Sequence, residues 1–189
     1  MIRLSKLLSQ KVIFNKYGKK LVVDTVKLLD GTTGDWTYFI CQPGVIIVSL
    51  TPGLKIILVK QYRYTLKTFT YENPAGGCHP NQMLKSAAKQ ELLEETSYVA
   101  PKIISLGTYY DLPSETNHQS QTFLALNCRL IETPKLDNEA EIYEELSVET
   151  HSFLDIFNSL GQKNSLIKSS EHTAAIFLAH RYLSSRHLL

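Results

Sequence analysis

The alternation of apolar and polar residues predicts a β-rich first half of the chain. Short apolar runs alternate with turn residues from residue 12 to about residue 41, and Asp30-Gly31 is a typical hairpin dipeptide. Residues 45–50 and 55–60 are two nearly continuous apolar runs that flank Pro52-Gly53, which predicts two buried strands joined by a tight turn. We therefore expect a small antiparallel sheet first and the main core after it.

The second half mixes predicted helices and strands. Residues 82–96 are rich in Leu, Ala, Lys, Gln and Glu, and Asn81 is placed to cap this helix. The preceding Asn-Pro-Ala-Gly-Gly cluster at 73–77 is a predicted loop. Strands are expected at 103–110 and 121–130, with a polar loop at 111–119, and helices at 147–160 and 171–183. The fold class is therefore α+β.

Composition narrows the class of protein. The 189 residues, 43% of them hydrophobic, suffice for one globular domain with a small appendage. A net charge of +2 gives no basic field for nucleic acid, and no apolar run approaches the roughly 20 residues that cross a bilayer. Three cysteines without CxxC spacing fit a reducing compartment, so we expect a cytoplasmic protein with neither a nucleic-acid nor a membrane partner.

Three carboxylates crowd one face of the 82–96 helix. Glu91, Glu94 and Glu95 lie within about 100° of arc, and no cation stands four residues before any of them. The helix dipole also disfavours negative charge in this C-terminal half. Mg²⁺ would relieve both conflicts, because it takes oxygen ligands from carboxylates. A solvated, Glu-rich helix face is the alternative, and the helix by itself leaves both interpretations open.

The preceding glycines and the helix together resemble a known motif. Gly76 and Gly77 let the backbone come close to a ligand or ion. The stretch 76–98, GGCHPNQMLKSAAKQELLEETSY, resembles the Nudix box, with Gly76, Glu91, Leu92, Glu94 and Glu95 at matching positions. It departs where Gln82 replaces Glu, Gln90 replaces Arg, Ser97 replaces Gly and Tyr98 replaces an aliphatic residue. The resemblance implies an α/β/α sandwich with a mixed sheet.

Flanking residues are similar to one branch of that family. Residues 56–63 (IILVKQYR) and 71–76 (YENPAG) resemble the signature of Nudix hydrolases that act on ADP-ribose and other nucleotide sugars. The resemblance implies that the Ala75 carbonyl joins Glu91, Glu94 and Glu95 as a metal ligand. It also implies that Arg63 and Glu72 contact substrate, beside the backbone of Gly76 and Gly77. The alternative is that Arg63 and Glu72 only pair with each other.

Two later segments extend the resemblance. Residues 109–114 (YYDLPS) resemble a substrate loop of ADP-ribose pyrophosphatases, with Pro113 matching and Ser114 in place of Gly. His118 lies near a position where many members have Glu, and its role is open. In the acidic segment at 137–142, the resemblance makes Glu139 and Glu141 candidates for the general base and Glu141 a further metal ligand. A plain solvated loop is the alternative there.

The first 45 or so residues resemble the N-terminal sheet of the same branch of the family, which crosses over to the partner subunit in a homodimer. This implies an N-terminal β-sheet subdomain at 1–44 and a Nudix domain at 45–189. Trp36 then falls where some members stack an aromatic ring on the nucleobase, although the only Trp of the chain could equally be core of the small sheet.

The resemblance as a whole implies a hydrolase. It would use Mg²⁺, or Mn²⁺, to cleave the pyrophosphate of a nucleoside diphosphate sugar into a nucleoside monophosphate and a sugar phosphate. Glu139, Glu141 and Glu94 are its catalytic candidates. The departures at Gln82, Gln90 and Ser97 motivate an alternative, a sensor that binds a nucleotide sugar without turnover. A Nudix enzyme that cleaves RNA or nucleoside triphosphates is less favoured, because the QYR and ExPAG residues match the sugar branch.

Overall fold

The computed structural model describes residues 6–16, 19–131 and 146–189, and these fall into two compact units. The first unit contains Met1–Pro43 and Tyr109–Ser120, and the second contains Gly44–Thr108 and Gln121–Leu189. The division at residue 44 in the sequence analysis did not include residues 109–120 with the N-terminal strands. Three free cysteines, Cys41, Cys78 and Cys128, are distributed over both units.

The first unit is built on a three-stranded antiparallel sheet in the order β1-β2-β3. Its strands are β1 (Lys6–Lys16), β2 (Lys19–Lys27) and β3 (Thr33–Cys41). The predicted hairpin at Asp30-Gly31 is confirmed, since it joins β2 to β3 and Gly31 has the positive φ of 87° that favours glycine. Residues 111–118 attach to β3, where Phe39 N donates to Glu115 O at 2.8 Å.

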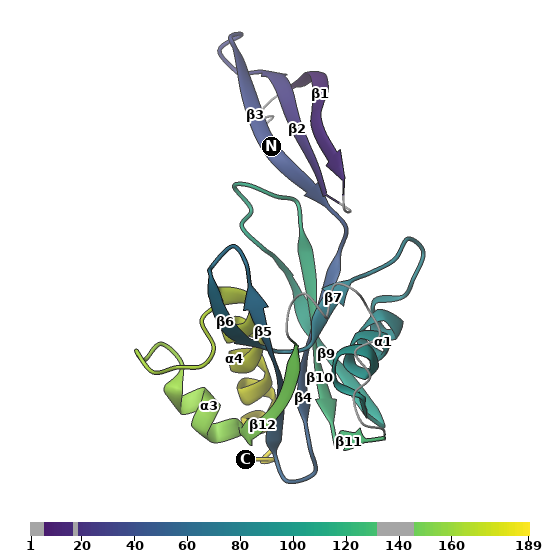
Figure 1. Cartoon of the computed structure of the whole chain (residues 1–189). Helices are drawn as coiled ribbons and strands as arrows, with labels where there is room; N and C mark the ends of the chain where they lie inside the picture. Colours follow the sequence, from purple (N-terminus) through teal and green to yellow (C-terminus); the bar gives the residue numbers. More distant parts are fainter. Residues whose placement is uncertain (1–5, 17–18, 132–145) are drawn as a thin grey trace. The chain divides into compact units, whose positions relative to one another are not determined.

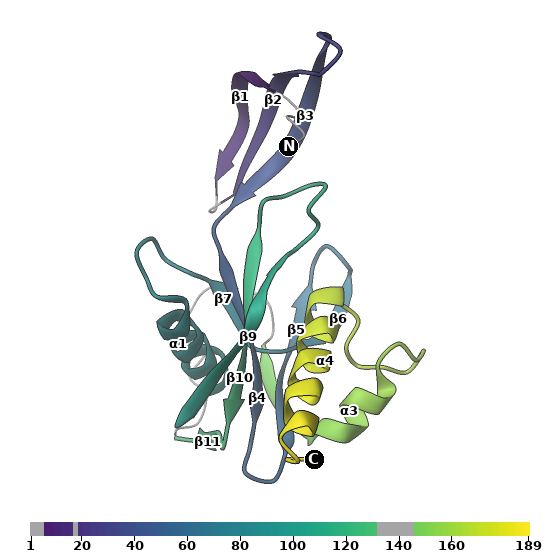
Figure 2. The same ribbon diagram turned by 180° about the vertical axis from the view of Figure 1, so that it is seen from behind.

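The second unit is a seven-stranded sheet between two layers of helix (Figures 1 and 2). The sheet order is β12-β5-β4-β10-β9, with β6 on β5 and β7 on β4. Its strands are β4 (Gly44–Leu50), β5 (Lys55–Arg63), β6 (Thr68–Glu72), β7 (Ala75–Gly77), β9 (Lys102–Tyr110), β10 (Gln119–Leu126) and β12 (Ser147–Ser152). Strand β8 (Tyr98–Val99) follows α1 in the chain and pairs with β11 (Arg129–Leu130) in a separate two-stranded sheet. Helix α1 (Leu84–Thr96) covers one face, and α3 (Phe153–Ser159) and α4 (Ser170–Ser185) cover the other.

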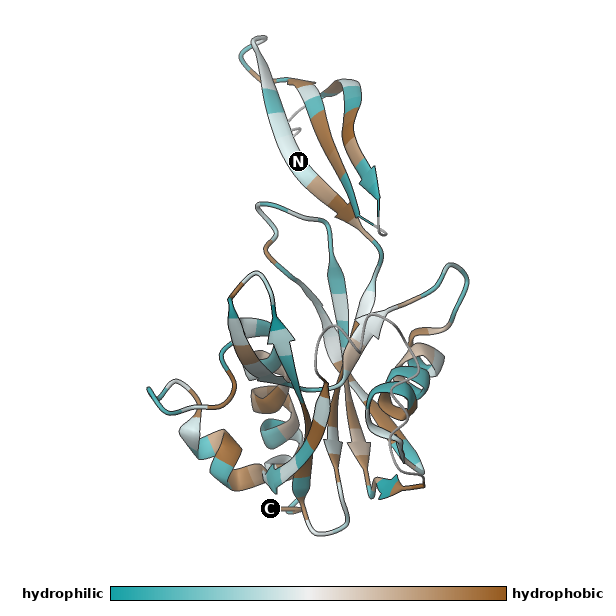
Figure 3. Cartoon of the chain, viewed as in Figure 1, coloured by the Kyte–Doolittle hydropathy of each residue, from teal (hydrophilic) through white to brown (hydrophobic). Residues whose placement is uncertain are grey.

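Strand β4 shows why helices cover both faces of this sheet. All seven of its residues are buried, and successive side chains point to opposite faces. Val45 and Ile47 pack with Ala88 and Leu92 of α1, whereas Ile46 and its alternate neighbours pack with α4. Figure 3 shows the hydrophobic residues gathered in these central strands and along α4. The two apolar runs of the sequence are thus the middle of a doubly covered sheet.

One predicted helix is wrong in its first half. Residues 147–152 form β12, which pairs antiparallel with β5, and only α3 after them is helical. The segment SVETHS alternates polar and β-branched residues, a period of two that suits an edge strand. Ser152 then caps α3, where its hydroxyl accepts a hydrogen bond from Asp155 N. The predicted closing helix at 171–183 is confirmed as α4.

The segment before α1 also differs from its prediction. Met83, not Asn81, is the N-cap residue of α1, and Asn81 has a left-handed φ of 67° that excludes it from the helix. Residues 75–77, predicted as loop, form β7, because their backbone pairs with residues 44–46 of β4. Short pairing of this kind depends on a neighbouring strand and not on local propensity. It fixes the backbone next to α1.

Candidate active site

Helix α1 and strand β7 bring a carboxylate against a glycine. A Cβ atom added at Gly76 would overlap the carboxylate of Glu91. Only glycine allows this approach, because it has no side chain. Gly76 and Glu91 match the same motif in the sequence, and the structure places them in contact.

A second carboxylate of α1 faces the same strand. Glu95 Oε2 accepts a hydrogen bond from the backbone N of Ala75 at 3.0 Å. Burial raises the pKa of Glu95 to about 8, and repulsion from Glu91 adds to this effect against the Ala75 hydrogen bond and the charge of Arg63. The negative charge of Glu95 is therefore poorly compensated by the protein itself.

The third carboxylate of α1 has a different partner. Glu94 is exposed and accepts a hydrogen bond from Gln90 Nε2 at 2.8 Å. Gln90 in turn accepts from Gln82 Nε2 at 2.9 Å, and Gln82 accepts from His79 N at 3.0 Å. The two glutamines that depart from the motif thus touch each other. They form a neutral chain of hydrogen bonds that ends on Glu94.

The oxygen atoms along α1 and β7 fit a hard divalent cation. Two glutamate side chains and a backbone segment with a carbonyl at Ala75 lie together, and the unfavourable charge of Glu95 would be relieved by a cation. Within residues 6–16, 19–131 and 146–189, no three His, Cys, Asp or Glu side chains are grouped closely enough to hold a metal ion. A metal at this place would therefore need ligands besides Glu91 and Glu95.

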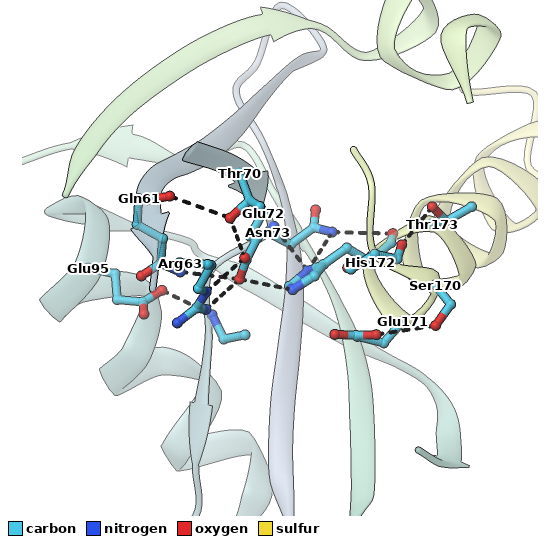
Figure 4. Close-up of polar contacts among 12 residues, drawn as sticks. Gln61, Arg63, Thr70, Glu72, Asn73, Glu95, Ser170, Glu171, His172 and Thr173 are labelled. Atoms are coloured by element: carbon cyan, nitrogen blue, oxygen red, sulfur yellow. Dashed lines mark hydrogen bonds and ion pairs between the residues drawn. The ribbon is translucent and has the colours of Figure 1, made fainter. Parts of the chain in front are cut away.

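Beside Glu95 lies a buried polar cluster at the ends of β5 and β6 (Figure 4). Arg63 forms a two-pronged ion pair with Glu72, with Nε to Oε1 at 2.9 Å and Nη2 to Oε2 at 2.6 Å. Thr70 and Gln61 also donate to the Glu72 carboxylate, at 2.6 and 3.1 Å. The structure thus pairs the two residues expected to contact substrate with each other, and the Arg63 side chain is still 38% exposed.

The donors around Glu72 decide its charge. Burial by itself would raise the pKa of Glu72, but hydrogen bonds from Arg63, His172 and Thr70 outweigh it and hold the pKa well below its usual range. The neighbouring carboxylates Glu72 and Glu95 consequently have pKa values shifted in opposite directions. Such divergence is typical of functional sites.

His172 is a member of this cluster that the sequence analysis missed. It belongs to the first turn of α4, is 3% exposed, and places Nε2 3.4 Å from Glu72 Oε2. A signal was present in the sequence, since His172 shares the helix face of Ala175, Ile176 and Ala179. A histidine on an apolar helix face is buried, and a buried imidazole needs polar partners.

The first unit contains three of the predicted substrate residues. Trp36 is 55% exposed and lines a hollow of about 680 Å³ together with Asp24 and Tyr38, so it is not core of the small sheet. Pro113 and Ser114 are exposed in the loop between β9 and β10. In the same loop, His118 Nδ1 lies 2.9 Å from Asp111 Oδ2. Glu139 and Glu141 lie outside the described residues.

The sequence of this chain is similar to those of known proteins. The sequence model of the NUDIX domain matches residues 41–173. The chain is 28% identical over 155 residues to "ADP-ribose pyrophosphatase" of Bacillus subtilis (strain 168), covering 82% of this chain and 83% of that protein. It is 32% identical over 117 residues to "Methanol dehydrogenase activator" of Bacillus methanolicus, covering 60% and 63%.

A solved structure supports the fold in particular. The "Crystal structure of ADP compounds hydrolase" matches with a TM-score of 0.84 at 16% identity, covering 100% of this chain and 99% of that one. At this low identity the match concerns the fold alone, and it confirms the predicted α+β sandwich with a mixed sheet and a small antiparallel sheet. No helix among the described residues is long and apolar enough to span a membrane.

Proposed function

Since this chain belongs to the Nudix family, we propose that it hydrolyses the pyrophosphate bond of ADP-ribose or a related nucleoside diphosphate sugar. The products are a nucleoside monophosphate and a sugar phosphate. The observation that carries the proposal is the placement of Glu91 against Gly76 and of Glu95 on Ala75 N, beside Arg63. The similarity to a pyrophosphatase over most of both chains supports the substrate class.

The cation we propose for this site is Mg²⁺, with Mn²⁺ as a substitute. Glu91, Glu95 and the Ala75 carbonyl would hold it, together with Glu94 or Glu141. When bound, the cation supplies neutralisation of the diphosphate charge.

Protein residues supply the remaining functions. Arg63 binds the charged part of the substrate, and the backbone at Gly76 and Gly77 lets the diphosphate approach closely. A carboxylate of the acidic segment at 137–142, Glu139 or Glu141, accepts the proton of the attacking water as the new P–O bond forms. The bond from phosphorus to the bridging oxygen breaks, and the second phosphate leaves with that oxygen. Trp36, Pro113 and Ser114 of the first unit are further candidates for substrate binding in our proposal.

We also propose that the chain acts as a cytoplasmic homodimer. Every residue of β1 is exposed in the single chain, and five large apolar side chains of β1 are 43–54% exposed: Leu7, Leu8, Val12, Ile13 and Phe14. Apolar strands of this kind are stabilised when a partner covers them. Free cysteines fit a reducing compartment.

Phosphate release tests the proposed activity. ADP-ribose, GDP-mannose, UDP-glucose and dinucleotides are incubated with the protein and an added phosphatase, once with Mg²⁺ and once with EDTA. We expect metal-dependent turnover of a nucleotide sugar, and a loss of at least about 100-fold in the E91Q and E95Q variants. Glu171→Gln is the matched control, because it makes the same substitution at an exposed glutamate on α4.

The alternative, a sensor, predicts a different result. The reason to consider it is the departure from the motif at Gln82, Gln90 and Ser97, where Gln82 and Gln90 form a neutral pair in place of a charged one. A nucleotide sugar that binds in EDTA and is recovered intact after incubation with Mg²⁺ would replace the hydrolase proposal by the sensor. Turnover in Mg²⁺ would exclude the sensor.

A further inference from the structure

The His172 side chain ties the Arg63–Glu72 pair to helix α4. Gln61 and Arg63 belong to β5, and Thr70 and Glu72 belong to β6, so these contacts stay within one pair of adjacent strands. His172 comes from α4, about one hundred residues later in the chain. Helix α4 packs Ala175, Ile176, Ala179 and Leu183 into the core against β4, which makes it a rigid support.

The hydrogen bonds of His172 fix which ring nitrogen faces Glu72. The backbone N–H of Asn73 points at Nδ1 at 3.1 Å, and Asn73 is 1% exposed, so this donor has to be satisfied inside the protein. Nδ1 must therefore accept, and the ring proton lies on Nε2. Nε2 is 3.4 Å from Glu72 Oε2 and can donate to it. The Asn73 bond thus orients the imidazole toward the carboxylate.

Because Glu72 is held by His172, it also fixes the orientation of Arg63. Its two oxygens receive both prongs of the guanidinium, so the orientation of the carboxylate sets the orientation of Arg63. Arg63 in turn lies next to Glu95 in Figure 4, and its positive charge partly opposes the rise in the pKa of Glu95 that burial causes. The chain of contacts therefore runs from α4 through Glu72 to the cluster on α1.

We propose that His172 is a positioning residue that donates from Nε2 to Glu72 and thereby holds Arg63 in place for the substrate. Its effect on kinetics rests on the proposed function, but its effect on Arg63 does not. Misplacing a charged clamp weakens substrate binding without removing the groups that carry out the chemistry. The expected signature is a change in KM and not in kcat.

Two substitutions at position 172 test the contacts of Nδ1 and Nε2 one at a time. Asparagine at 172 places an amide oxygen where Nδ1 was, so it keeps the bond to Asn73 N and removes the donor to Glu72. Glutamine reaches the position of Nε2 with its amide nitrogen, so it keeps the donor to Glu72. His180→Asn is the matched control, because His180 lies on the same helix and stacks on Phe157 with 3.7 Å between ring centroids, away from Glu72.

The kinetic measurement is steady-state hydrolysis of ADP-ribose in saturating Mg²⁺. We expect H172N to raise KM about fivefold, the loss of about one hydrogen bond, with kcat within about twofold of wild type. H172Q and H180N should keep KM within about twofold. In an Arg63→Ala background, H172N should raise KM no further. An unchanged KM in H172N, or a fivefold rise in H172Q, would overturn the proposal.

Hydrogen exchange at Arg63 is the readout that needs no activity. The Nε–H of Arg63 is bonded to Glu72, so its NMR signal should exchange slowly in the wild type and in H172Q, and several times faster in H172N. Equal protection in all three proteins would refute the positioning role. If the wild type hydrolyses no substrate of the panel, the proposed function fails, and this exchange measurement still decides the role of His172. If H172N does not fold, H172Q and H180N decide it, since loss of Arg63 protection in H172Q would contradict the proposal.

Discussion

Substitution of Gly76 should have the most specific effect of any single residue, because one methyl group there would occupy the place of the Glu91 carboxylate. A carboxylate at the end of a flexible side chain can move aside at little cost in stability. Such a movement would, however, separate Glu91 from β7 and from the proposed cation site. Stability and activity should therefore respond differently to the same substitution.

We predict that Gly76→Ala folds with a melting temperature within about 3 °C of wild type and loses at least about 100-fold in kcat/KM. Thermal unfolding and the phosphate-release assay measure the two effects. Gly53→Ala is the control, since a Cβ there meets no atom within 4 Å. A G76A variant that retains wild-type activity and the wild-type Mg²⁺ requirement would show that the contact with Glu91 has no role.

The raised pKa of Glu95 makes a second prediction at this scale. Without metal, the folded protein keeps the Glu95 proton up to about pH 8, whereas the unfolded chain loses it near 4.5. The stability of the metal-free protein should therefore fall as the pH rises through this window. Glu95→Gln should remove this contribution, so its melting temperature in EDTA should exceed that of wild type more at pH 8 than at pH 5. Parallel pH profiles for the two proteins would contradict the prediction, and Glu171→Gln should follow the wild type.

At the scale of elements, α1 presents two different sets of side chains. Glu91 and Glu95 face β7, whereas Glu94 accepts a hydrogen bond from Gln90, which itself accepts one from Gln82. Gln90, which stands where the motif has arginine, donates to Glu94 at 2.8 Å.

We therefore predict that Gln90→Ala lowers kcat by about threefold to tenfold, because Glu94 loses its partner. KM for ADP-ribose should stay within about twofold, and steady-state kinetics measure both values. Lys89→Ala is the neighbouring exposed control on α1. If Q90A and K89A are indistinguishable, the bond to Glu94 does not contribute to turnover.

Elements were predictable from sequence where their own residues determine them. The runs at 45–50 and 55–60 are apolar enough to be strands in any covered sheet, and α4 has a regular apolar face. β12 was mistaken for helix, since its strand state depends on pairing with β5. β7 was mistaken for loop for the same reason, because β4 supplies its pairing.

The exposed apolar side chains of β1 suit an interface with a second copy of the chain. Its side chains are exposed throughout, including Val12 and Phe14, while the β2 side chains Val22 and Val26 are buried. An edge strand with so many apolar side chains is poorly suited to solvent. The proposed dimer would cover it.

We predict that light scattering gives the wild type twice the 21.4 kDa mass of the chain, and that Phe14→Glu shifts it toward the single-chain mass. The reason is the cost of placing a charge in an apolar interface. Lys11→Glu, also on β1, should remain dimeric. A wild-type protein that elutes with the mass of one chain at micromolar concentration would refute the dimer.

The sequence indicated the candidate site only in part. The motif residues Gly76, Glu91 and Glu95 lie close together, because pairing with β4 places β7 beside α1. The pairing of Arg63 with Glu72 was foreseen only as an alternative. His172 was not foreseen, because a contact across about one hundred residues depends on how α4 packs on the sheet.

The backbone from the end of β6 to the first residue of β7 is held at three consecutive residues by three distant elements. Asn73 N bonds to His172, Pro74 O accepts from Ile47 N, and Ala75 N bonds to Glu95. During synthesis on the ribosome, the contacts to β4 and α1 can form as soon as residue 95 has emerged. The contact to α4 must wait for some eighty further residues, so a nascent chain that stops before residue 172 lacks the contact from His172 to Glu72.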